Sequence, residues 1–175
     1  MTATTFTFPA TYHEFHTDQT FNFQLNRWYS MGYARLEDMK AAGQAIHSFE
    51  EWNTQMVKLA EIAAAEDRLV NAAFYYRAAE FFTTRDDPQK ESLYHKFIDL
   101  FYRAAQNDEI KKHEVPYKET FMHAIQVSPA GTKKGTLVVH GGNDSFIEEF
   151  YSLIGYFADN GYEVIAFDGP GQGAT

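Results

Sequence analysis

The sequence predicts an α/β protein in which a helical region precedes the first strands of a sheet. Residues 19–110 carry apolar side chains at the three- and four-residue spacing of helix faces, whereas residues 113–168 contain short strand-like runs around one helix. The change of period lies near residue 112. We therefore expect a helical domain at residues 1–112 and an incomplete α/β domain at residues 113–175.

The composition is that of a globular protein and excludes several classes of function. Of the 175 residues, 45% are hydrophobic and 17% are aromatic, which rules out disorder as the main state. The absence of Cys excludes disulfides, thiolate metal sites and a Cys nucleophile. A formal net charge of -9 argues against nucleic-acid and anionic-membrane partners. Because neither a bilayer-spanning apolar run nor a secretory signal at Met1–Pro9 is visible, a cytoplasmic protein is expected.

Helix-start signals organise the first domain. Ser48 followed by Glu51 fits a capping box, and Asp87 followed by Pro88 fits a capped helix start with proline in its first turn. The expected helices are Phe21–Tyr29, Arg35–Ala45, a helix beginning at Ser48, Asp67–Phe82, and a helix beginning at Asp87–Pro88.

The helix expected at Asp67–Phe82 has one apolar side rich in alanine, which allows a neighbouring helix to approach closely. That side carries Leu69, Ala72, Ala73, Tyr76, Ala79 and Phe82. The pattern resembles a tetratricopeptide helix, but such arrays repeat a unit of about 34 residues at least three times, and no second copy is present. An ordinary helical bundle is the favoured interpretation, and a non-catalytic helical interaction module stays open as the alternative.

The second domain is expected to begin with a hairpin and to continue with a strand–helix–strand unit. The continuous apolar run Thr136–His140 predicts a strand that is buried on both faces, as in a parallel sheet. The expected elements are strands at Glu114–Tyr117, Phe121–Val127, Thr136–His140 and Tyr162–Asp168, and a helix at Ser145–Asn160 that Gly161 ends. A sheet that stopped after Asp168 would have an unprotected edge there, so we expect a truncated sheet from a larger enzyme.

The motif His140-Gly-Gly-Asn-Asp-Ser145 lies between a predicted buried strand and a predicted helix. Two adjacent glycines allow a sharp turn that exposes backbone N–H groups, and N–H groups beside a helix N-terminus stabilise a developing oxyanion. The alternative is a plain strand-to-helix turn with Asp144 or Ser145 as the N-cap. The local sequence does not separate these two interpretations.

A second glycine-rich motif, Asp168-Gly-Pro-Gly-Gln-Gly173, follows the next predicted strand. Such a loop can cradle phosphate. Here the spacing is G-x-G-x-G, Pro170 removes one N–H donor, and no P-loop lysine follows. A structural turn near a site is therefore favoured over a nucleotide-binding half-domain.

Neither the histidines nor the paired carboxylates predict a metal site. His13 and His16 lie close together, but in a segment without a clear pattern, and the other histidines are scattered. The carboxylate pairs, interpreted as solvated faces or caps, are Glu50-Glu51, Asp86-Asp87 and Glu148-Glu149. No metal or organic cofactor is expected.

The ordered set of strand, His-Gly-Gly-x-Asp, helix, strand and Asp-Gly-Pro-Gly-x-Gly over residues 136–173 strongly resembles the α/β-hydrolase superfamily. The segment Tyr75–Phe81, followed by Val115-Pro-Tyr117, resembles the branch with an N-terminal helical cap. That branch contains the fermentation–respiration switch protein, acylaminoacyl-peptidase-like proteins and the 2,6-dihydroxypseudooxynicotine hydrolase. The resemblance spans about residues 20–175 and implies a helical cap followed by the first strands of an α/β-hydrolase sheet, truncated before the nucleophile elbow.

The resemblance also implies roles for residues of the first glycine loop. Gly142 or Asn143 would supply one oxyanion-hole N–H, and the residue after the nucleophile would supply the other. His140 would organise the loop and would not be the triad base. The further residues that would support the loop are Gly141, Asp144 and Asp168.

The implied function is that of the N-terminal part of a serine-type hydrolase. The whole enzyme would cleave an ester, an amide or an activated C–C bond next to a carbonyl. The helical cap would cover the carboxyl ends of the strands and line a pocket for a small-molecule substrate with an apolar or aromatic part. An open sheet edge makes a homo-oligomer or a completing chain the expected protein partner.

We predict that the 175-residue chain alone does not hydrolyse esters by the triad route. No serine in it has glycines at both flanking offsets of G-x-S-x-G, so the nucleophile elbow is missing. The resemblance implies that the acid and the base also lie beyond Thr175. Turnover of p-nitrophenyl acetate by the isolated chain measures this. A rate that saturates with substrate and is abolished by a serine-directed phosphonate would contradict the prediction.

Overall fold

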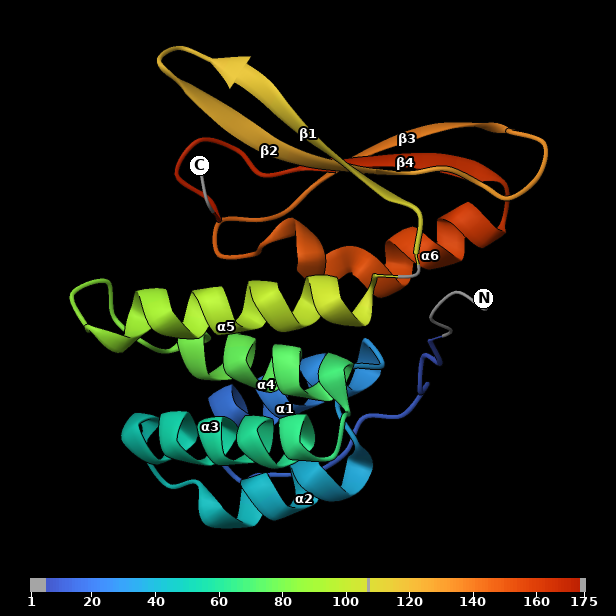
Figure 1. Ribbon diagram of the computed structural model, residues 1–175. Coiled ribbons are helices and arrows are strands. Elements are labelled where there is room, and N and C mark those ends of the chain that lie inside the picture. Colours follow the sequence, from blue (N-terminus) through green and yellow to red (C-terminus); the bar gives the residue numbers. More distant parts are fainter. Residues whose placement is uncertain (1–5, 107, 174–175) are drawn as a thin grey trace. The chain divides into compact units, whose positions relative to one another are not determined.

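The computed structural model describes residues 6–106 and 108–173, which form two compact units. One unit, Phe6–Gln106, is helical, and residues 108–173 of the other form a sheet with a helix (Figure 1). Within these two ranges, no helix combines the length and apolar character needed to cross a bilayer.

The helical unit contains the helices that the sequence predicts, with small shifts at their ends. They are α1 (Gln19–Ser30), α2 (Leu36–Ala45), α3 (Phe49–Ala65), α4 (Leu69–Phe81) and α5 (Gln89–Ala104). Helix α4 begins later than expected because Asp67 has a φ of 56°, which is left-handed and incompatible with a helix start.

Two predicted helix starts are confirmed in their capping residues. The Ser48 hydroxyl accepts a hydrogen bond from Glu51 N–H at 3.1 Å. The Glu51 carboxylate closes the motif one residue earlier than a standard capping box, because it accepts from His47 N–H at 2.7 Å. At α5, the Asp87 carboxylate accepts from Gln89 N–H at 2.8 Å, and Pro88 precedes the helix instead of lying in its first turn.

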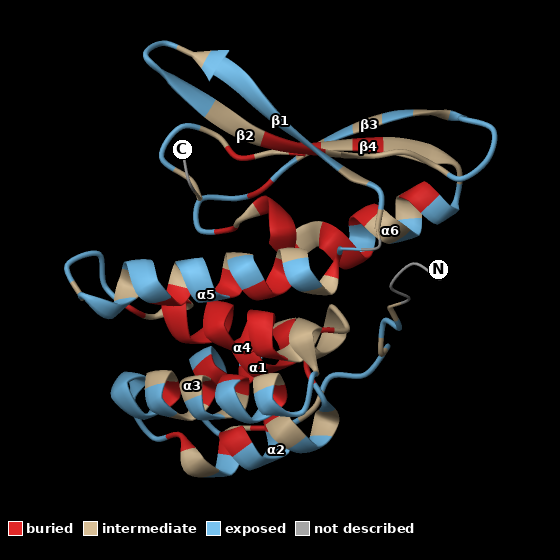
Figure 2. Cartoon of the chain, in the orientation of Figure 1, coloured by how far each residue is buried: buried red, intermediate tan, exposed pale blue. Residues whose placement is uncertain are grey.

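Helix α4 is buried on all sides, so the expected single apolar face is wrong. Figure 2 shows it as a nearly continuous buried element, and residues Ala72 to Glu80 are all buried. The physical reason is that α3 and α5 both pack against it. Its four buried alanines, Ala72, Ala73, Ala78 and Ala79, let these neighbours approach closely.

A buried ion pair lies on α4. Arg77 and Glu80 are each 2% exposed, and their side chains pair directly. Lys90 of α5 adds a second cation, with its Nζ 2.6 Å from Glu80 Oε1. The Arg77 guanidinium also lies 5.2 Å from the ring centroid of Phe81, within cation–π range.

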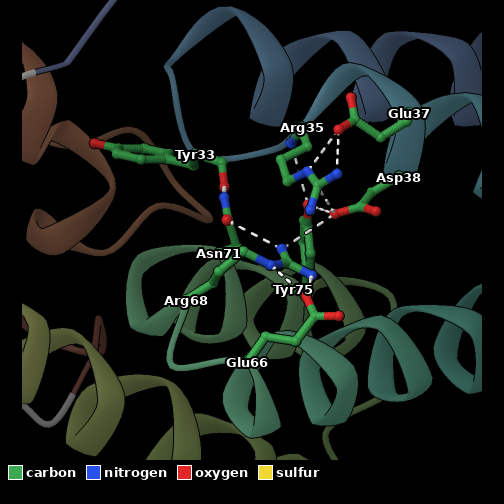
Figure 3. Close-up of polar contacts among 8 residues, drawn as sticks. All are labelled: Tyr33, Arg35, Glu37, Asp38, Glu66, Arg68, Asn71 and Tyr75. Atoms are coloured by element: carbon green, nitrogen blue, oxygen red, sulfur yellow. Dashed lines mark hydrogen bonds and ion pairs between the residues drawn. The ribbon is translucent and has the colours of Figure 1, made fainter.

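A polar network connects α2 with the beginning of α4 (Figure 3). The Tyr75 hydroxyl donates to Asp38 Oδ2 at 2.8 Å and accepts from Arg35 N–H at 3.1 Å. Arg68 Nη1 approaches the same Asp38 oxygen at 3.3 Å. Burial raises the pKa of Tyr75, so the phenol keeps its proton and remains a donor at neutral pH.

The other unit is a four-stranded mixed sheet with one helix. Its elements are β1 (Ile110–Tyr117), β2 (Thr120–Val127), β3 (Gly135–His140), a 3-10 turn (Ile147–Phe150), α6 (Tyr151–Asp159) and β4 (Tyr162–Phe167). The strand order is β1-β2-β4-β3, with β3 parallel to β4 and the other pairs antiparallel. The core lies between the sheet and α6 and contains Ile125, Ile147, Ile154, Val164 and Ala166.

The predicted burial of Thr136–His140 on both faces is wrong. In the described sheet, β3 pairs with β4 alone, its residues alternate between half-buried and exposed, and Val138 is 66% exposed. The sequence also predicts that the strand ending near Asp168 forms the open edge of the sheet. This position is wrong, because that strand, β4, lies between β2 and β3. The edges of the described sheet are β1 and β3.

The crossover helix starts later than the sequence suggests. The chain enters a 3-10 turn at Ile147 and becomes α-helical at Tyr151, so neither Asp144 nor Ser145 is the N-cap. Gly161 ends the helix as predicted, with a φ of +92° that favours glycine.

We expect Glu80→Ala to lower the free energy of unfolding by about 3 to 5 kcal/mol, because it leaves the buried Arg77 guanidinium without its carboxylate. The matched control is Glu91→Ala on the exposed surface of α5, where an ion pair contributes little. Urea unfolding followed by the fluorescence of the buried Trp28 and Trp52 measures both variants. Equally small losses for the two would contradict this account of α4.

Candidate functional site

The two glycine-containing loops leave the sheet at the same edge. Strands β3 and β4 are parallel, and the register pairs His140 with Phe167 at their carboxyl ends. Residues 141–146 follow β3, and residues 168–173 follow β4. Because the carboxyl ends of adjacent parallel strands meet at one edge, the pairing places both motifs side by side.

Gly141 is required by close packing. A Cβ added there would lie 3.0 Å from Ser145 Cβ and 3.3 Å from the Phe150 ring. At Gly142, the nearest atom to an added Cβ is Ser145 Oγ at an ordinary 3.7 Å. Neither glycine has a positive φ, so neither occupies the left-handed region that favours glycine.

His140 holds the first peptide of the loop. Its Nδ1 lies 2.9 Å from the Gly141 carbonyl oxygen. Since a carbonyl can only accept, Nδ1 carries the proton in this contact. The ring also lies 5.9 Å from the Phe167 ring, centroid to centroid. The structure thus gives His140 a contact that orients the loop backbone.

The next two backbone N–H groups belong to exposed residues and have no hydrogen-bond acceptor in the part of the chain that the structure describes. Gly142 and Asn143 are exposed. Among the described residues, neither N–H donates a hydrogen bond. Both groups lie on the loop that leads from β3 into the 3-10 turn. Chemically, this arrangement suits an anionic oxygen.

Asp168 is a buried link between the two loops. Its side chain is 3% exposed, and its Oδ1 accepts from Ile147 N–H at 3.1 Å. Its own N–H donates to the His123 carbonyl at 3.0 Å. The carboxylate therefore fixes the beginning of the 3-10 turn to the end of β4. Asp144, by contrast, is exposed on the tip of the first loop.

The sequence suggests that Glu148 and Glu149 form a solvated face or a cap, and only the cap agrees with the structure. Both are buried, at 6% and 3% exposure, so neither belongs to a solvated face. Glu149 does serve as a cap, because its Oε1 accepts from Phe146 N–H at 3.0 Å. The N-terminus of the crossover helix thus receives carboxylates from both Glu149 and Asp168.

Gln172 is the residue at this edge that sequence reasoning missed. Its Nε2 donates to the Gly142 carbonyl, and its Oε1 accepts from Gly169 N–H at 2.9 Å. The side chain therefore joins the second loop to the first. A signal was present in the sequence, because Gln172 lies between two glycines in the loop after β4. That strand pairs with β3, which leads into the first motif.

Two of the backbone N–H groups of the second loop are already used by the loop itself. Gly169 N–H is bonded to the Gln172 side chain, and Gln172 N–H is bonded to the Gly169 carbonyl at 3.0 Å. Pro170 has no N–H. This geometry favours the structural turn over the nucleotide-binding alternative.

Metal ligation finds no support in the described residues, where no group of three or more His, Asp or Glu is suitably placed. At His16, both ring nitrogens already have partners. Nε2 lies 2.8 Å from the Ile46 carbonyl, and Nδ1 accepts from Asp18 N–H at 2.8 Å.

No protein-family model matches the chain. It is 29% identical over 181 residues to "Alpha/beta hydrolase gkaG" of Penicillium citrinum, covering 87% of this chain and 42% of the relative. It is 28% identical to "Alpha/beta hydrolase ucsC" of an Acremonium species, covering 86% of this chain and 32% of that protein. The chain therefore spans less than half the length of these curated relatives.

Solved structures show the same arrangement of elements. The structure titled "AbyA5 Wildtype" aligns with a TM-score of 0.68 and 18% identity, covering 89% of this chain and 46% of that one. The 2,6-dihydroxy-pseudo-oxynicotine hydrolase aligns with a TM-score of 0.58 and 22% identity, covering 85% and 46%. At these identities the likeness concerns the fold.

We expect Gly141→Ala to destabilise the sheet unit by about 1 to 3 kcal/mol, because the added methyl group meets Ser145 and Phe150. Gly131→Ala is the matched control, since an added Cβ there has no neighbour within 4 Å. Hydrogen exchange of the β3 and β4 amides reports on this unit separately from the helices. Equal protection in the two variants would contradict the packing role of Gly141.

Proposed function

The chain has the α/β-hydrolase fold that its motifs resemble, and on this premise we propose that it supplies one half of the oxyanion hole of a serine-type hydrolase. The substrate carbonyl becomes a tetrahedral oxyanion when a serine attacks it. The first glycine loop, residues 141–146, would bind that oxygen.

One observation carries the proposal: two exposed backbone N–H groups, of Gly142 and Asn143, lie at the carboxyl edge of the sheet on a loop held by its own side-chain contacts. Donors that are already oriented do not have to reorganise as charge develops. Loss of one such donor typically lowers kcat by about 100- to 1000-fold. His140, Gly141 and Asp168 support the loop in the ways described above, and Asp144 lies at its tip.

The remaining chemistry would come from outside these residues. In this superfamily the nucleophile lies in G-x-S-x-G, and the N–H after it is the second oxyanion donor. The acid and the histidine base follow in that order along the chain. Neither a metal nor an organic cofactor is needed for this route.

The proposed substrate is a small molecule with a carbonyl next to the bond that is cleaved, and with an apolar or aromatic part. The scissile bond would be an ester, an amide or an activated C–C bond. The helical unit by itself contains a groove of about 1020 Å³, whose lining includes the exposed aromatic rings of Tyr12 and Phe23 among polar side chains. A groove of this size admits a molecule of drug-like dimensions.

The test is covalent labelling of the complete native gene product with a fluorophosphonate probe, followed by peptide mapping. We expect one labelled serine, within G-x-S-x-G and outside residues 1–175, and an intact mass well above the 20.1 kDa of this chain. Substitution of that serine by alanine should abolish both the label and ester turnover.

A native product that takes up no label would contradict the serine-type proposal. If its mass were also 20.1 kDa, the helical interaction module or a split enzyme completed by another chain would become the better account. Heat-denatured protein is the control for non-specific labelling.

A further inference from the structure

We propose that Gln172 is a positioning residue, which fixes the peptide between Gly142 and Asn143 so that the Asn143 N–H is the oxyanion donor of the first loop. The inference rests on the proposed function and sharpens it, because the loop offers two candidate N–H groups. It also gives the second glycine motif a role at the same site.

Both ends of the Gln172 amide are engaged. Nε2 donates to the Gly142 carbonyl across the two loops. Oε1 accepts from Gly169 N–H at 2.9 Å, within its own loop. The backbone N–H of Gln172 closes the same turn by donating to the Gly169 carbonyl at 3.0 Å. The side chain is therefore held in place before it reaches the first loop.

The direction of the Asn143 N–H follows from the planarity of the peptide bond. None of the described peptide bonds is cis. In a trans peptide, the C=O of one residue and the N–H of the next point in opposite directions. Because the Gly142 carbonyl points at Gln172, the Asn143 N–H points away from the second loop. Asn143 is an exposed residue, and among the described residues its N–H donates no hydrogen bond.

The preceding peptide is held in a different way. The Gly141 carbonyl contacts Nδ1 of the preceding residue, His140 at the end of β3, at 2.9 Å. By the same reasoning, this contact orients the Gly142 N–H. Gln172, in contrast, reaches the 142–143 peptide from the loop after β4. It thereby fixes the Asn143 donor relative to the second loop, a segment far away in the sequence.

The chemistry of the position requires an amide. Glutamine carries a donor and an acceptor on one rigid group. Glutamate has the same shape, but its carboxylate only accepts, so it would face the Gly142 carbonyl with a like partial charge. Methionine has a similar length and replaces both hydrogen bonds with an apolar group. Glutamate therefore removes the donor and keeps the shape, whereas methionine removes both hydrogen bonds and keeps the length.

The test compares Gln172→Met and Gln172→Glu in the complete gene product, with Gln106→Met as the matched control at an exposed position of the helical unit. We expect kcat to fall by about 10- to 100-fold in both Gln172 variants, less than the roughly 100- to 1000-fold typical for outright loss of an oxyanion donor, because Asn143 keeps its N–H. KM should change by less than about twofold. The control should retain the parent kcat.

Two readouts exclude a merely structural effect. Titration of active sites by the phosphonate burst gives kcat per competent enzyme, so misfolded protein does not count. A crystal structure of Gln172→Met should show the 142–143 peptide rotated from its parent orientation. Full kcat in Gln172→Glu, or an unchanged peptide in Gln172→Met, would overturn the proposal.

The failure of the positioning role can be told apart from failure of the proposed function. If the parent protein takes up no fluorophosphonate, the serine-type function fails, and the orientation of the 142–143 peptide still tests the contact with Gln172. If the parent is labelled and both variants keep the parent kcat, the serine-type function stands and the role of Gln172 is wrong.

Discussion

The parallel pairing of β3 with β4 is the constraint on which the candidate site depends. It ends both strands at one edge and brings loops that lie almost thirty residues apart in sequence within reach of single side chains. Gln172 then joins the second loop to the first by a hydrogen bond, and Asp168 joins it to the 3-10 turn that follows the first loop. Without this register, the exposed N–H groups of the first loop would have no fixed position relative to the sheet.

The two loops show how side-chain hydrogen bonds can hold the backbone N–H donors of a glycine-rich segment in one orientation. Glycine-rich loops have a large conformational entropy in the unfolded chain. Here the carbonyls of Gly141 and Gly142 are each held by a side chain, which leaves the opposite N–H groups oriented and free. Such preorganisation is the property that makes an oxyanion hole effective.

Much of the fold could be predicted from the sequence, because helix periods, capping residues and the change to strand-like runs are local signals. The α/β-hydrolase resemblance likewise depended on ordered local motifs. Burial could not be predicted from local sequence. Val138 was expected to be internal and lies on an edge strand, whereas Glu148 and Glu149 were interpreted as a solvated face or a cap and are both buried. Gln172 was missed because its role depends on a contact across the two loops, which only the strand register creates.

The most direct test of the central claim is a crystal structure of the complete gene product carrying a covalent phosphonate on its nucleophilic serine. The account predicts the phosphonyl oxygen about 2.7 to 3.1 Å from the Asn143 nitrogen, the range for an oxyanion-hole donor, with the Gly142 carbonyl still bonded to Gln172. A phosphonyl oxygen bound away from the 141–146 loop would contradict it.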